Sequence, residues 1–202
     1  MGLFSLEHGR LAYRADFVCY GAAVLLMAVA LPLGAPLRQW PALAALVLLG
    51  LGLWSLAEYG LHRFVLHGVQ PFHRWHLAHH QRPQALIGSP TLMSATLFAA
   101  LVFAPAWRLI GLWPATAVTL GMVAGYLGYA MVHHAMHHLP ARHSWLRQRR
   151  YWHALHHGGA RQPCCYGVSS AFWDNVFGSL PRPTRRTAAA ASRHANAVVK
   201  QQ

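Results

Sequence analysis

The chain has 202 residues, of which 55% are hydrophobic and only 10% are charged, well below the charged share of about 25% in soluble domains. This length predicts a single domain over residues 1–202, and the composition excludes an ordinary soluble enzyme and predicts an integral membrane protein. The net charge is +13. The basic residues flank apolar spans, so retention on the cytoplasmic side and contact with anionic lipid explain this excess better than binding of nucleic acid. Nucleic acid is therefore not an expected partner.

Four apolar stretches are each close to the ~20 residues that a membrane-spanning helix needs. They cover about 17–37, about 40–57, part of 83–107 and part of 109–132. Arg108 alone interrupts the last two stretches, which predicts a tight helical hairpin. In the fourth stretch Gly121 and Gly125 form a GxxxG motif, which favours close packing against another helix.

The arginines predict how these spans are oriented. Arg38 and Arg108 lie in the two turns on one side, whereas every other basic residue lies before the first span, between the second and third, or after the fourth. The positive-inside rule therefore predicts cytoplasmic termini, and we expect a location in a bacterial inner membrane. Residues 141–179 are expected to form one or two helices on the membrane surface, and 181–202 a basic flexible tail.

Thirteen of the 16 histidines fall into four clusters, all on the predicted cytoplasmic side. Imidazole is the commonest neutral metal ligand, and residues spaced i, i+3, i+4 share one face of a helix. Four clusters hold more ligands than one ion can use, so the pattern predicts a two-metal centre. The clusters are His62/His67, His73/His76/His79/His80, His133/His134/His137/His138 and His153/His156/His157.

The spacing alone leaves two questions open. His62 and His67 are five residues apart and do not align on an ideal helix, so the helix must end or distort between them if both bind metal. The third cluster contains two alternative i, i+4 pairs that the spacing does not separate: His133 with His137, and His134 with His138.

Five segments within residues 58–179 together resemble the membrane fatty acid hydroxylase/sterol desaturase superfamily, and most closely its fatty acid 2-hydroxylase branch. The segments are Glu58-Tyr59-x-x-His62-Arg63-Phe64-x-x-His67, His76-x-x-His79-His80, His133-x3-His137, Tyr151-x-His153-x-x-His156-His157 and the stretch from Tyr166 to Gly178. We therefore expect an all-α membrane protein, with four transmembrane helices and a cytoplasmic helical cap that carries a histidine-rich dimetal site.

The resemblance also implies the ligand set, and it selects one of the two pairs in the third cluster. The implied ligands are His62, His67, His76, His79, His80, His133, His137, His153, His156 and His157. No catalytic residue beyond these ligands is predicted. Five further residues are interpreted as groups that orient the ligands: Glu58, His73, His134, His138 and Asp174. The alternative is a position at the membrane interface for the three histidines and a helix-end or capping role for the two carboxylates.

The chemistry that the resemblance implies is O2-dependent oxidation of a lipid at two iron ions. Zinc has no second oxidation state, so iron is the expected working metal even if zinc occupies the purified protein. The expected substrate is a fatty acyl or sphingolipid acyl chain, with a carotenoid or a sterol as the alternative within the superfamily. Electrons would come from a partner such as cytochrome b5, ferredoxin or a reductase, and a basic rim including Arg147, Arg149 and Arg150 is expected to dock an acidic carrier.

Two functions of other classes explain the sequence less well. A metal transporter usually places its site near the bilayer midplane, whereas these histidines lie at the ends of the spans and beyond them. A membrane zinc hydrolase would need a general base, for which only Glu58 is available near the histidines.

Overall fold

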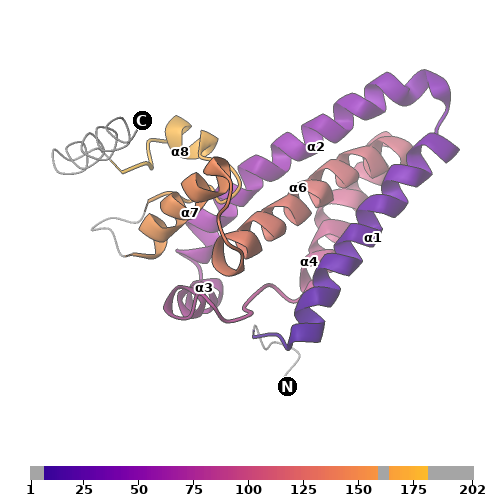
Figure 1. The fold of residues 1–202 in the computed structure, drawn as a ribbon. Helices are drawn as coiled ribbons and strands as arrows, with labels where there is room; N and C mark the ends of the chain where they lie inside the picture. The colour runs from indigo at the N-terminus through magenta and orange to yellow at the C-terminus, as the bar shows by residue number, and fades with distance from the viewer. Residues whose placement is uncertain (1–6, 159–163, 182–202) are drawn as a thin grey trace.

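The computed structural model describes residues 7–158 and 164–181. Within these ranges the regular secondary structure is helical apart from one isolated bridge between Glu7 and Ile87. It has four helices that are long and apolar enough to cross a membrane. These helices form one bundle, and the shorter helices gather at one end of it (Figure 1). The predicted all-α membrane fold is therefore confirmed, whereas the tail predicted at 181–202 lies outside the described residues from 182 onward.

The helices follow the predicted order along the chain. The ends of each span differ from those of the apolar stretch that predicted it. The first span is α1 (Arg10–Gly34). The second runs through the 3-10 helix η1 (Leu37–Gln39), α2 (Trp40–Gly60) and the π-helix η2 (Leu61–Leu66). The third combines α4 (Thr91–Leu97), the π-helix η3 (Phe98–Phe103) and α5 (Ala104–Ile110), and the fourth is α6 (Leu112–His138). Outside the bundle lie α3 (Phe72–Gln81), α7 (Ser144–His157) and α8 (Phe172–Val176).

Helix α6 is the central span, because it contacts the other three. In its most apolar stretch 44% of the residues are buried, against 17% or less in the other spans. Its closest neighbour is α2, where Gly50 faces Gly121. A Cβ atom on Gly121 would collide with the carbonyl oxygen of Val47 and with the Cα of Gly50. The close packing predicted from the GxxxG motif is therefore confirmed.

The predicted hairpin between the third and fourth spans is also present. Gly111 alone separates α5 from α6, and its φ of 87° lies in the left-handed region, which residues with a side chain adopt at a cost. Pro114 lies in the first turn of α6, where its missing N–H leaves no helical hydrogen bond unmade. Because α5 and α6 are joined so tightly, the third span is held against the central one.

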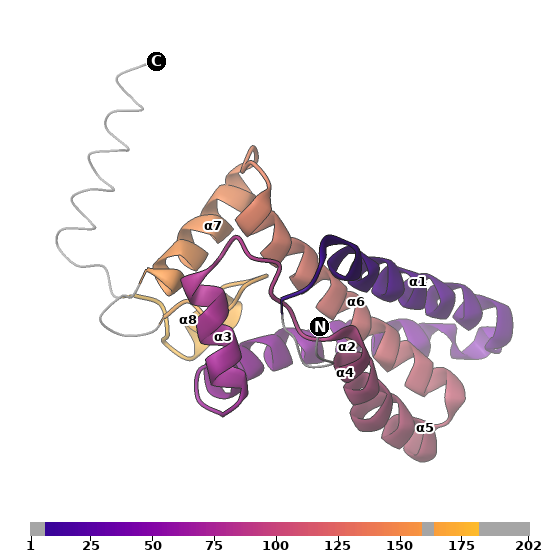
Figure 2. The ribbon, with the colours of Figure 1, turned by 90° about the horizontal axis from the view of Figure 1, so that it is seen from below.

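Helices α3, α7 and α8 form a cap at the end of the bundle where α1 begins and α6 ends (Figures 1 and 2). The turn between α1 and α2 lies at the opposite end. The cap therefore brings the segments that carry the four histidine clusters to one end of the molecule.

We expect Gly121→Ala to destabilise the protein, because the added methyl group meets backbone atoms of α2 that cannot move aside. Overpacking of this kind costs about 1–3 kcal/mol. Gly52→Ala is the matched control, since Gly52 also lies in a span and a Cβ there meets nothing within 4 Å. Thermal unfolding in detergent should show a lower midpoint for Gly121→Ala only. Equal midpoints for the two variants would contradict the close α2–α6 contact.

Candidate metal centre

The five-residue spacing of His62 and His67 is accommodated by a π-helix. Hydrogen bonds in a π-helix run between residues five apart, so such residues lie on the same face. The π-helix η2 covers Leu61–Leu66 and ends at His67, and the ring centroids of His62 and His67 are 5.2 Å apart. The distortion that ligation by both residues would require is therefore present.

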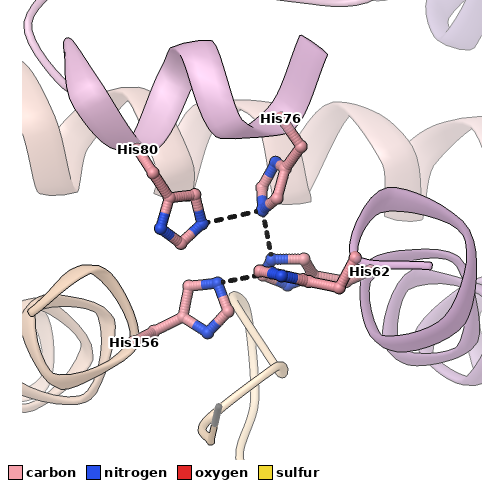
Figure 3. A group of neighbouring side chains, drawn as sticks. His62, His76, His80 and His156 are labelled. Carbon is pink, nitrogen blue, oxygen red and sulfur yellow. Dashed lines mark hydrogen bonds between the residues drawn. The ribbon is translucent and has the colours of Figure 1, made fainter. Parts of the chain in front are cut away.

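A first group of five imidazoles forms where η2, α3 and α7 meet. Its members could share a metal ion, because their ligand atoms all lie within 4.8 Å of one another: His62, His67, His76, His80 and His156. The Nε2 atom of His76 lies 3.0 Å from that of His62 and 2.9 Å from that of His80. Figure 3 shows these rings and that of His156 pointing toward a common space from three separate segments.

A second group of four imidazoles forms between α3, α6 and α7. It consists of His79, His133, His137 and His153, whose ligand atoms also lie within 4.8 Å of one another. The Nε2 atom of His133 lies 3.1 Å from that of His79. The Nε2 atoms of His137 and His153 are 2.8 Å apart. Of the two pairs that the spacing of α6 offers, the structure places His133 and His137 in this group.

His157 is the one predicted ligand outside both groups, and it lies between them. Its ring stacks on that of His80, with centroids 4.2 Å apart, and lies 4.4 Å from the ring of His153. Both of its ring nitrogens are buried, and neither has a hydrogen-bond partner within the described ranges. A buried polar atom without a partner is costly. This imidazole therefore fits a site in which a bound metal ion would be the partner of one of its nitrogens.

The loop of residues 164–170 fixes the orientation of two imidazoles in the first group. The Nδ1 atom of His62 donates a hydrogen bond of 2.5 Å to the carbonyl oxygen of Tyr166. The Nδ1 atom of His156 donates one of 2.7 Å to the carbonyl oxygen of Cys164. A proton on Nδ1 leaves the lone pair on Nε2, which is the arrangement that metal-binding histidines commonly adopt.

Glu58 and Asp174 hold this loop in place. Glu58 is 4% exposed and accepts hydrogen bonds of 2.8 Å from the backbone N–H groups of Val168 and Ser169, and one of 2.5 Å from the Ser169 hydroxyl. Asp174 is 1% exposed and accepts bonds of 2.8 Å and 2.7 Å from the N–H groups of Tyr166 and Gly167. The two carboxylates therefore contact the loop rather than the histidines. They act on the imidazoles only through the loop, whose carbonyl groups contact the rings directly.

The three remaining clustered histidines lie outside both groups. The Nδ1 atom of His134 lies 3.2 Å from the hydroxyl of Tyr13, and its ring stacks on that of His138. His73 lies 3.3 Å from the side-chain amide of Gln70 in an exposed contact. None of the three forms a hydrogen bond with a grouped histidine within the described part of the chain, so their positions fit interface residues better than groups that orient the ligands.

Four of the predicted ligand imidazoles are neutral at physiological pH. Burial, reinforced by repulsion from neighbouring imidazoles, lowers the pKa of His67 and His157 to about 4, that of His80 to about 3 and that of His79 to about 2. Their lone pairs are therefore free to bind a cation at neutral pH. Sites made only of imidazoles suit iron, zinc, copper or nickel, whereas magnesium and calcium prefer oxygen ligands.

A cavity of about 130 Å³ adjoins both groups of histidines. His76 of the first group and His79 and His133 of the second lie in its wall, which we call the reaction cavity. The remaining wall is mostly aromatic and apolar and comes chiefly from α1, α3 and α6, with Tyr13, Asp16, Phe17, Phe72, Trp75, Met93, Tyr126 and Tyr129 among its residues. The site therefore opens onto a space between helices that span the membrane.

The predicted basic rim is smaller than expected. Arg149 is 7% exposed, and Arg150 donates hydrogen bonds to the carbonyl oxygens of Ala135 and Leu139 at the C-terminal end of α6. Only Arg147 of the three predicted arginines is exposed. Arg150 contacts the end of α6 because the short α6–α7 connection folds α7 back against it, and Arg149 is buried.

Comparison with known proteins identifies the family. The profile described as fatty acid hydroxylase matches residues 47–179, the part of the chain that holds both histidine groups. The chain belongs to the fatty acid hydroxylase family. The family expected from the sequence is therefore confirmed.

Relatives in this family carry names that agree with the 2-hydroxylase branch. The dihydroceramide fatty acyl 2-hydroxylase FAH2 of Arabidopsis thaliana is 33% identical over 70% of this chain and 63% of its own length. The ceramide very long chain fatty acid hydroxylase SCS7 of Saccharomyces cerevisiae is 35% identical over 66% of this chain and 37% of its own. The chain thus spans less than two thirds of the length of these relatives.

The fold also matches a solved structure of the fatty acid hydroxylase family. Full-length scs7p, of which only the hydroxylase domain is visible, superimposes with a TM-score of 0.71 at 28% identity, covering 85% of this chain and 67% of that one. The four-span bundle and its cap are therefore an arrangement that this chain shares with that hydroxylase domain.

We expect Glu58→Ala to loosen the loop that orients His62 and His156. The substitution leaves the N–H groups of Val168 and Ser169 without an acceptor, and each unpaired buried group costs about 1–3 kcal/mol. Loss of such supporting contacts weakens metal binding by about 10–100-fold. Both the unfolding midpoint and the metal content of purified protein should fall.

The control is Glu7→Ala, because Glu7 is exposed and its ion pair with Arg82 lies on the surface. Such pairs contribute no more than about 1 kcal/mol. Glu58→Gln retains one acceptor oxygen and should behave between the wild type and Glu58→Ala. Full metal content in Glu58→Ala would show that the loop is held without this carboxylate.

Proposed function

We propose that this protein is a membrane-bound hydroxylase that oxidises the acyl chain of a lipid with O2 at two iron ions. The observation that carries the proposal is the convergence of two groups of neutral imidazoles, from four separate segments, beside one cavity between membrane-spanning helices. Membership of the fatty acid hydroxylase family and the names of the relatives support the same reaction class.

We propose that the two ions are bound by the histidines of the two groups together with His157. His62, His67, His76, His80 and His156 would hold one ion, and His79, His133, His137 and His153 the other. His157 lies beside both groups and would complete one of them. Iron ions held there would supply the O2 activation that cleavage of an unactivated C–H bond needs, which no side chain in the protein provides.

The protein itself positions the substrate and keeps water away from the site. An acyl chain can enter the reaction cavity from the bilayer between the spans that line it, because residues of α1, α4 and α6 form its wall. The aromatic side chains exclude water from the reacting carbon. A fatty acyl or sphingolipid acyl chain is the substrate that this narrow cavity and the relatives' names favour.

The test is to measure metal content and product together. Protein purified from iron-supplemented cells should contain about two iron atoms per chain, as a two-metal site requires, and host lipids should gain one oxygen atom from labelled O2. His79→Ala and His156→Ala should lose metal and product, because each removes a ligand from a different group. His143→Ala is the control, since His143 is exposed before α7. Normal turnover in the two ligand variants would refute the proposal.

We further propose that the cap faces the cytoplasm of a bacterial inner membrane and receives electrons there from an acidic carrier such as cytochrome b5, ferredoxin or a reductase. The distribution of arginines along the chain supports this orientation. A reporter protein that is active only in the cytoplasm should therefore be active when it is fused to the C-terminus.

The exposed arginines of the cap offer a test of carrier docking. Arg142, just before α7, and Arg147, in the first turn of α7, are both exposed. Changing both to Glu should lower the rate of electron transfer, and the loss should shrink at high salt, because exposed charges act mainly on association. Arg38→Glu, which places the same charge at the opposite end of the bundle, should leave the rate unchanged. An unchanged rate in the double variant would exclude this docking surface.

A further inference from the structure

A second cavity lies between the beginning of α1 and the end of α6. Its volume is about 460 Å³, and its wall consists of Arg10, Tyr13, Arg14, Phe17, Leu86, Met131, His134 and Leu139. We call it the α1–α6 cavity. It shares Tyr13 and Phe17 with the reaction cavity, but none of the grouped histidines lies in its wall.

One side of the α1–α6 cavity is strongly basic. Arg10 and Arg14 are one helical turn apart on α1 and therefore lie on the same face. Both are exposed, and neither forms an ion pair within residues 7–158 and 164–181. The beginning of α1 has no acidic residue and no side-chain cap, so the positive end of the helix dipole adds to the two guanidinium charges. This arrangement is unfavourable unless an anion lies nearby.

The acidic residues near this cavity do not balance its charge. Asp16 lies in the wall of the reaction cavity instead, where it accepts a hydrogen bond of 2.8 Å from the hydroxyl of Thr91. Glu7 pairs with Arg82 at 2.8 Å. The wall of the α1–α6 cavity thus holds two arginines and His134 but no carboxylate.

The other side of the cavity is apolar and open to the surroundings of the bundle. Phe17, Leu86, Met131 and Leu139 form it, and Met131 and Leu139 are 57% and 48% exposed. The cavity lies where α1 begins its span and α6 completes one, so it lies at the boundary between the lipid headgroups and the acyl chains. A basic side next to an apolar side at this depth is complementary to an anionic amphiphile.

We propose that the α1–α6 cavity binds the phosphate group of an anionic membrane lipid. Arg10 and Arg14 donate hydrogen bonds to the phosphate oxygens, a geometry for which guanidinium groups are well suited. The apolar residues contact the first part of the acyl chain. Free phosphate would satisfy the arginines but leave the apolar wall uncovered, so the lipid is the favoured ligand. The site is independent of the two metal groups and does not rest on the proposed hydroxylase activity.

The experiment is native mass spectrometry of the detergent-purified full chain with three probes. Two are phosphatidylglycerol and phosphatidylcholine with identical acyl chains, and the third is inorganic phosphate. The wild type should bind phosphatidylglycerol at least about tenfold more tightly than phosphatidylcholine, because each arginine near a membrane surface contributes about fivefold in affinity. Arg10→Gln with Arg14→Gln should abolish this preference. Arg10→Lys with Arg14→Lys keeps the charges and should keep most of the preference.

Arg38→Gln with Arg108→Gln is the matched control, because it removes two exposed arginines from the opposite end of the bundle and should leave the preference intact. Circular dichroism and metal content would establish that every variant is folded. Equal binding of the two lipids by the wild type, or an unchanged preference in the Gln double variant, would overturn the proposal. Inorganic phosphate that displaces phosphatidylglycerol at similar concentrations would show a simple anion site and overturn the assignment to a lipid.

Discussion

The crowding of neutral imidazoles is the constraint on which the rest of the structure depends. Nine rings converge on two small volumes, and no carboxylate from the described part of the chain belongs to either group. If several of these rings were protonated together, their repulsion and the cost of burying charge would drive the groups apart. Burial holds the pKa of His79 and His80 well below neutrality, and the central α6 and the cap helices supply that burial. The fold therefore provides a partly buried enclosure of imidazoles that a pair of cations would complete.

The orientation of the imidazole rings depends on a loop that contacts them, and the two buried carboxylates hold that loop. Glu58 and Asp174 bind backbone N–H groups of the 164–170 loop, and carbonyl oxygens of the same loop bind the Nδ1 atoms of His62 and His156. The carboxylates thus stay outside the two histidine groups, and the peptide groups of the loop position the imidazoles of His62 and His156. This arrangement separates the chain from carboxylate-rich dimetal proteins, in which acidic side chains themselves bind the metals.

Much of this site could be predicted from the sequence, because helical spacing is local. The triplets on α3 and α7 follow from i, i+3, i+4 spacing, and the need for a distortion between His62 and His67 follows from their separation. The division into two groups could not be predicted, since His76 and His80 turn toward one group and His79 toward the other only after α3 is packed. The roles of the loop carbonyls were also hidden, because every residue has a carbonyl group and the partners of Glu58 lie about 110 positions away. The burial of Arg149 likewise depends on tertiary packing that charge counting ignores.

The π-helix at Leu61–Leu66 has a consequence for how the chain tolerates insertions and deletions over evolution. A π-helical turn holds one residue more than an α-helical turn. Removal of a single residue between His62 and His67 would restore regular α-helix and leave the two imidazoles at i, i+4, which still share one face. Every histidine would still be present in such a lineage, and the first group would keep both members from this segment. Homologues that keep all ten histidines but are one residue shorter within this stretch should therefore be read as equivalents rather than as altered proteins.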